Sequence, residues 1–313
     1  MAYPNGLDFS KVYPWSDIKT VTRDGQTMIY VPRTYTKEGK LESGKYAGNR
    51  YWMVSKTKDE GFHLPACFMY KGQELDHFCL ASYEASEGSG KPNSIAGAMP
   101  WNNIDNIQKA IDACNARNTG APGSEQYGWH LQTYYERSFI ARLMMIECGT
   151  PDVQTAIGKG NDYGYWNGKT VDNAAPCGKT DAVWRGLHEF WGNYIEWCDG
   201  LQVDGNSKYK VFDKQGNGTY VSTNILFADK GFAMASGDNF DLGDLFVPGD
   251  DGTNGSYSGS TGDGLFMTEP NHFLCTSGGW GNLSGCGAFW FEISNYPESS
   301  PEVYSFRLAK YDV

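Results

Sequence analysis

Apolar residues recur at helical steps of three and four in only two segments of this 313-residue chain, which strongly limits its possible folds. The first segment covers residues 101–117. The second is predicted to begin after Thr133, an N-cap residue whose capping-box partner is Glu136, and to stop at Gly149. No helix is predicted from Pro151 onward, so most of the chain must form strands and loops.

Short β-rich runs bounded by Gly, Pro and Asn indicate strands both before and after the two helices. Gly-, Asn-, Asp- and Ser-rich loops separate them at residues 158–180 and 249–264. The chain has 39 Gly, and 15% of its residues are aromatic, so large flat side chains are expected to hold irregular backbone. This order predicts an α+β fold with two helices, short twisted antiparallel strands and long loops. The predicted strands cover residues 27–32, 51–54, 75–84, 209–212, 219–221, 245–247, 287–293 and 303–308.

The charge balance argues against a nucleic-acid partner. Lys and Arg total 26 and Asp and Glu total 37, which gives a net charge of −11. Such a chain repels phosphate backbones. No apolar run approaches the roughly 18 residues of a membrane span, so no membrane insertion is expected. The first residues carry neither a basic start nor an apolar segment, so no signal peptide is predicted.

Eight cysteines occur without any Cys-x-x-Cys pair, so a zinc site is not expected. Their even number is compatible with four disulfides. The missing secretion signal instead favours eight thiols in a reducing compartment.

Common catalytic motifs are absent from the sequence. Residues 88–92 resemble the end of a phosphate loop, but Ala85 replaces its leading glycine and Pro92 its metal-binding hydroxyl. The tripeptide at 269–271 resembles that of mannose-binding lectins but lacks their partner motif, and the oxygen ligands fall short of what calcium needs. These patterns favour a protein that is not an enzyme.

The most informative segment is 184–197. Its Gly186-Leu187 and its Gly192-Asn193-Tyr194-Ile195-Glu196-Trp197 stretch resemble the Gly-Leu-x-x-x-x-Gly-Asn-x-x-Glu-Trp signature of the formylglycine-generating-enzyme type of C-type lectin fold. The resemblance implies this fold over residues 61–313, with a β-rich segment at 1–60 packed on it. Further matching pieces follow in the same order at residues 28–32, 76–86, 128–131, 278–280 and 306–309.

The closing block decides between two branches of this fold. The oxidase branch needs two cysteines there, because copper–thiolate chemistry uses both. Only Cys286 lies between Gly278 and Arg307, and Cys275 precedes the block. The block instead resembles the variable region, at about 278–307, of proteins diversified by a retroelement, such as phage tail receptor-binding proteins. This implies a protein of a virion tail or cell surface that binds a protein or glycan receptor. A formylglycine-generating-type oxidase and a structural tail subunit without receptor contact are the alternatives.

In such a region, variable positions alternate with a fixed frame. If 289–296 is a strand, alternation sends Trp290 and Tyr296 to solvent as an aromatic recognition pair. The expected frame comprises Gly278, Gly279, Trp280, Ser284, Cys286, Gly287, Phe289, Pro297, Phe306 and Arg307. The expected ligand-binding positions are Gly281, Asn282, Leu283, Gly285, Trp290, Glu292, Ser294, Tyr296, Ser299, Glu302 and Val303.

The same resemblance implies a structural calcium at the signature segment. Its ligands would be Glu189, Gly192, Tyr194 and Glu196. Glu196 could equally be a buried acid that is hydrogen-bonded to backbone. No other cofactor is expected.

Overall fold

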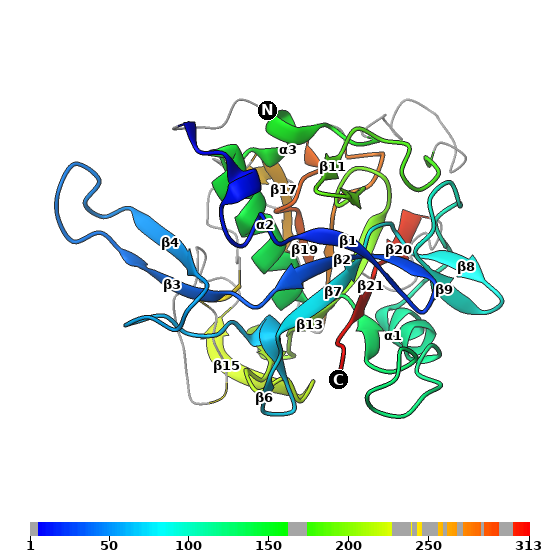
Figure 1. Cartoon of the computed structure of the whole chain (residues 1–313). Coiled ribbons are helices and arrows are strands. Elements are labelled where there is room, and N and C mark those ends of the chain that lie inside the picture. The colour runs from blue at the N-terminus through cyan, green and yellow to red at the C-terminus, as the bar shows by residue number, and fades with distance from the viewer. Residues whose placement is uncertain are drawn as a thin grey trace.

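Two large β-sheets, four two-stranded hairpins and three α-helices make up the regular structure of the described residues, and one long hairpin extends away from the rest (Figure 1). The computed structural model describes residues 6–161, 174–226, 239, 243–245, 256–258, 262–267, 272–282, 285–293 and 303–313. The arrangement of short, mostly antiparallel strands with few helices agrees with the predicted α+β class.

The first sheet brings both halves of the sequence together. It has the antiparallel order β1-β2-β7-β21-β10, so the last strand of the chain lies between β7 and β10. Its strands are β1 (Lys19–Arg23), β2 (Gln26–Pro32), β7 (His77–Ala81), β10 (Trp129–Leu131) and β21 (Leu308–Lys310). β2 pairs with β7 from Met28 opposite Ala81 to Pro32 opposite His77. The first 60 residues therefore contribute strands to a sheet that they share with residues after 61.

The second sheet is built around β13, a nine-residue strand that was not predicted from the sequence. The sheet order is β15-β14-β13-β18-β19-β17-β16, and β20 pairs in parallel with β13. Its strands are β13 (Ile195–Val203), β14 (Lys208–Phe212), β15 (Tyr220–Leu226), β16 (Ser256–Ser258), β17 (Asp263–Met267), β18 (His272–Thr276), β19 (Phe291–Ile293) and β20 (Tyr304–Phe306). The predicted strand 303–308 is split at Arg307 into β20 and β21, which belong to different sheets.

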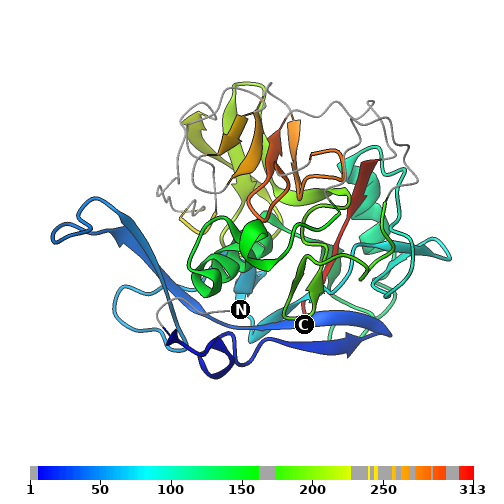
Figure 2. The same cartoon turned by 90° about the horizontal axis from the view of Figure 1, so that it is seen from above.

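Four two-stranded hairpins complete the β-structure. They pair β3 (Tyr35–Lys40) with β4 (Arg50–Ser55), β5 (Met69–Tyr70) with β6 (Gln73–Glu74), β8 (Ser86–Gly88) with β9 (Lys91–Asn93), and β11 (Val183–Trp184) with β12 (Leu187–His188). The β3–β4 hairpin is the arm that leaves the body (Figures 1 and 2). Short 3₁₀ turns lie at Phe9–Lys11 and Ala66–Phe68.

The helices are α1 (Ile107–Asn115), α2 (Tyr134–Cys148) and α3 (Val153–Ile157). The predicted capping box of α2 is present: Thr133 Oγ1 accepts from Glu136 N, and Thr133 N donates to the Glu136 carboxylate. Gly149 ends α2 in the left-handed conformation, as predicted. The expectation of no helix after residue 151 is wrong, because the Asp152 side chain caps α3. No α-helix among the described residues is long and apolar enough to cross a bilayer.

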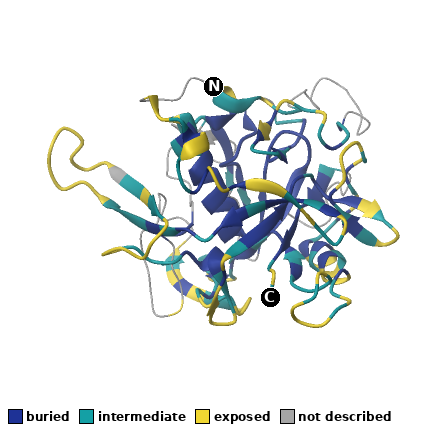
Figure 3. Ribbon diagram, viewed as in Figure 1, coloured by how far each residue is buried: buried dark blue, intermediate teal, exposed yellow. Residues whose placement is uncertain are grey.

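The core lies between the two sheets and around α2, which runs between them (Figures 2 and 3). None of the eight cysteines forms a disulfide, which agrees with the thiol alternative, and only Cys148 is more than slightly exposed. Aromatic side chains fill much of this interior, as the composition predicted. The largest fully buried aromatic side chains are Trp15, Trp129, Trp191, Trp280, Trp290, Tyr194, Tyr209, Phe68, Phe78 and Phe190.

Candidate binding surface and its buried frame

The predicted frame of the closing block is buried wherever the structure describes it. Ser284 and Pro297 lie outside the described residues. The buried frame residues are Gly278, Gly279, Trp280, Cys286, Gly287, Phe289, Phe306 and Arg307. Positions that must stay fixed in a diversified block thus face the interior.

Close backbone contacts hold the turn between β18 and β19. The Cys286 thiol donates to the Gly279 carbonyl at 3.0 Å, and the Trp280 ring lies edge-on to Tyr194 at 4.9 Å. A Cβ at Gly287 would fall 1.9 Å from Asp263 Oδ1, so only glycine fits there. Asp263 in turn accepts from the backbone N–H of Phe289 at 2.7 Å. The turn is therefore fixed by contacts with β17 and with the segment before β13.

A buried charge cluster lies beneath the block. Glu196, at the start of β13, accepts from Arg137 of α2 at 3.2 Å and from Arg307 at 2.8 Å. All three side chains are fully buried. Arg307 also donates to the carbonyls of Ala81 and Glu189. One guanidinium thus ties the closing block to β7 and to the signature segment.

A second buried acid joins the other motif segments. Glu84, from the matching segment 76–86, accepts from Asn193 Nδ2 at 2.5 Å and from Tyr194 N at 3.0 Å. Burial, and then the negative charges of Glu196 and Glu189, raise the pKa of Glu84 well above its usual value. Three of the segments that carry the family resemblance, 76–86, 184–197 and 306–309, therefore contribute buried polar groups that lie close together.

The expected calcium ligands do not fit a calcium site. Glu196 is paired with two guanidinium groups, whose positive charges oppose a cation. The Glu189 carboxylate accepts from the backbone N–H groups of Gly178 and Thr180. The Tyr194 ring packs against Trp280, and Gly192 N donates to the Gly278 carbonyl. Glu196 is a buried acid, as the alternative prediction held, but its carboxylate is paired with the guanidinium groups of Arg137 and Arg307 rather than with backbone.

Trp290 corrects the predicted binding surface. Its side chain is 2% exposed, lies 4.8 Å from the Phe266 ring and packs against Gly264. The prediction of an outward Trp290 is wrong because β19 begins only at Phe291, so strand alternation does not apply before it. From Phe291 to Ile293 the expected alternation is present, with Glu292 the partly exposed residue.

The remaining expected binding positions divide into three groups. Gly281, Asn282, Glu292 and Val303 are partly exposed, and Gly285 is buried like Trp290. Val303 immediately precedes β20, and Glu292 lies close enough to Tyr304 to help raise the pKa of its hydroxyl, after the larger effect of burial. Leu283, Ser294, Tyr296, Ser299 and Glu302 lie outside the described residues.

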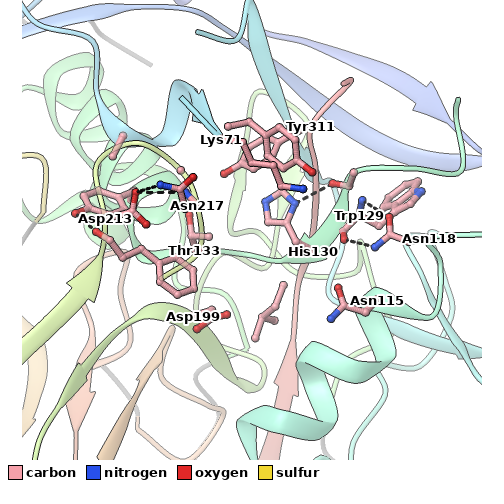
Figure 4. A pocket seen from close by; sticks show the side chains of 18 of the residues that line it. Lys71, Asn115, Asn118, Trp129, His130, Thr133, Asp199, Asp213, Asn217 and Tyr311 are labelled. Carbon is pink, nitrogen blue, oxygen red and sulfur yellow. Dashed lines mark hydrogen bonds between the residues drawn. The ribbon is translucent and has the colours of Figure 1, made fainter. Parts of the chain in front are cut away.

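A pocket of about 290 Å³ was not predicted from the sequence (Figure 4). It is lined by the β5–β6 hairpin, the end of α1, β10, the middle of β13, the β14–β15 turn and Tyr311. None of its lining residues belongs to 278–307. Six separate chain segments build it, so no local motif could reveal it, although one of them includes the segment 128–131 that carries part of the family resemblance.

Comparison with known proteins gives a match in structure alone. No protein-family model matches the chain, and no curated protein matches its sequence. PvdO from Pseudomonas aeruginosa is 10% identical and aligns with a TM-score of 0.39 over 94% of this chain and 97% of its own. Treponema denticola variable protein 1 is 14% identical and aligns with a TM-score of 0.40 over 94% of this chain and 99% of its own. TM-scores this low do not establish a shared fold subtype or a shared function.

Proposed function

We propose that this chain is a ligand-binding protein whose retroelement-diversified surface, within residues 281–303, recognises a protein or glycan receptor. It works on a phage tail or another surface, by recognition without catalysis and without a cofactor. The Gly-Asn-x-x-Glu-Trp signature and the closing block supply the family resemblance on which the proposal rests.

The division within the closing block is the observation that carries the proposal. The described frame residues are buried, whereas Gly281, Asn282, Glu292 and Val303 keep part of their surface exposed. Exposed side chains can be exchanged with little effect on the fold, whereas buried ones cannot. A block with this division can present new side chains without losing its backbone shape.

The buried charge cluster of Glu196, Arg137 and Arg307 supports the same function because it holds the end of the closing block in place. Arg307 fixes the end of the block to β7 and to the segment before β13. A surface held in one shape before binding loses less conformational entropy on association. Variation at a few positions can then change affinity without a new fold.

Randomising Gly281, Asn282, Glu292 and Val303 in a yeast-display library tests this proposal. We expect display levels close to those of the parent chain, because all four positions are partly exposed; Val303, which also packs against the core, and Asn282, whose Oδ1 accepts from Gly279 N, should tolerate the fewest residue types. Selection against a panel of purified proteins, for example lysozyme, serum albumin and ovalbumin, should yield clones that bind one panel member and not the others. Flow cytometry measures both quantities.

A matched library at exposed Thr20, Glu74 and Asp112 and at partly exposed Lys91 serves as the control, with expected display but few specific binders. Loss of display in the first library, or equal binder yields in both, would contradict the proposed surface.

Sequencing the DNA beside the gene tests diversification separately: the proposal requires a near-copy of the 3′ coding end that differs at adenines, next to a reverse transcriptase.

Copper titration distinguishes the proposal from the oxidase alternative. Cys275 lies within β18, Cys286 donates its thiol proton to a backbone carbonyl, and both side chains are fully buried. We expect Cu(I), added with a competing chelator, to bind no more tightly to the protein than to a Cys275→Ser/Cys286→Ser variant. Stoichiometric copper that is lost in that variant would support the oxidase and overturn our proposal.

A further inference from the structure

The pocket near the C-terminus has several aromatic side chains in its walls. Tyr70 and Tyr127 join their hydroxyls at 3.0 Å, and the Tyr311 ring packs against His130 at 4.1 Å and against Tyr70 at 5.7 Å. Tyr135 donates its hydroxyl to the carbonyl of Phe212, and both residues also line the space. The electron-rich faces of such rings attract cations.

A cation of this chain already lies on one of these walls. Lys71 is exposed, and its Nζ lies 5.0 Å from the centroid of the Tyr70 ring. The long side chain can leave this position at little cost, because it is flexible and solvated. The Tyr70 wall therefore has the geometry to receive an ammonium group.

Asp199 provides an acidic group inside the pocket. It comes from β13 at the point where the register with β18 shifts, and Figure 4 shows it near Thr133 and His130 around the same space. Its Oδ1 accepts from Gly200 N at 2.8 Å and from the Tyr220 hydroxyl at 2.6 Å. No residue in the described part of the chain donates to Oδ2. Burial raises the pKa of Asp199, while the hydrogen bonds from Tyr220 and Gly200 and the charge of His130 oppose this shift.

The other charged groups of the pocket are engaged within the protein. His130 Nδ1 lies 3.0 Å from the Gly128 carbonyl oxygen and Nε2 lies 3.0 Å from Glu136 Oε1, so both ring nitrogens face partners within the protein. The Asp213 carboxylate accepts the N–H groups of its own turn, including those of Asn217 and Thr219. Asp199 is thus the acid available for a ligand.

We propose that this pocket binds a small organic ammonium ion, with the aromatic rings around the cation and Asp199 Oδ2 as its anionic partner. The site is separate from the diversified surface and goes beyond the proposed function. The pocket volume of about 290 Å³ suits a ligand of few atoms.

Calorimetry with choline and with its uncharged carbon isostere, 3,3-dimethylbutan-1-ol, tests the proposal on the full chain. We expect choline to bind and the alcohol to bind at least about tenfold more weakly, because a charged partner strengthens the contact with a carboxylate. Asp199→Asn keeps the acceptor for Tyr220 and Gly200 and should weaken choline binding by a similar factor. Asp112→Asn, on the exposed side of α1, removes the same charge and should leave binding unchanged.

The Lys71→Met variant tests whether the ligand is a cation or an anion. It removes the ammonium group that lies on the Tyr70 ring, so choline should bind with equal or higher affinity. Absence of choline binding to the unmodified chain, equal binding of the alcohol, or unchanged binding in Asp199→Asn would each overturn the proposal. A sugar panel that binds where choline does not would identify a neutral ligand instead. These outcomes leave the proposed function untouched, since no pocket residue lies in the closing block.

Discussion

We expect Glu196→Gln to lower the free energy of unfolding by about 3–5 kcal/mol, the loss typical of breaking a buried ion pair from one side. The carboxylate of Glu196 faces Arg137 and Arg307, and all three side chains are fully buried. Gln keeps the shape and one acceptor oxygen but removes the negative charge. Two buried guanidinium groups would then remain without a carboxylate partner among the described residues.

Urea denaturation followed by tryptophan fluorescence measures this loss. Asp105→Asn is the matched control: Asp105 forms a 2.6 Å pair with Lys109 on the surface, and such pairs contribute less than about 1 kcal/mol. A Glu196→Gln variant as stable as the Asp105→Asn variant would show that the arginines are compensated in another way. It would also remove the main reason for assigning rigidity to the closing block.

Helix α2 was predicted from the sequence because its signals are local. Thr133 and Glu136 form the capping box within one turn, and Gly149 supplies the left-handed stop. Strand β13 has no comparable signal. Its residues are buried on both faces for most of its length, so the period of two that marks a half-buried strand is missing.

The candidate site was predictable only in part, for a related reason. The sequence motifs correctly placed Trp280, Cys286 and Arg307 in a buried frame. The partners of Glu196 were not predicted, because Arg137 is 59 residues and Arg307 is 111 residues away in the sequence. No periodicity relates residues so far apart, and only the packing of α2 against β13 brings them together.

Trp290→Ala is expected to lower the free energy of unfolding by about 3–5 kcal/mol, because it leaves a cavity where a large side chain was packed. The ring of Trp290 contacts Phe266 and fills the space beside Gly264 and Gly278. Its Nε1 has no acceptor among the described residues, so Trp290→Phe removes a buried donor and should lose less stability than Trp290→Ala. Thermal and urea unfolding measure both changes.

Glu292→Ala is the control for Trp290, since it alters a partly exposed side chain two residues further along and should change stability by less than about 1 kcal/mol. Equal losses of unfolding free energy in Trp290→Ala and Glu292→Ala would show that the burial of Trp290 does not determine the effect. The contrast also determines how binding data must be interpreted. Weaker target binding by Trp290→Ala can arise from a loosened frame alone, whereas a loss in Glu292→Ala or Asn282→Ala at unchanged stability indicates direct contact with the target.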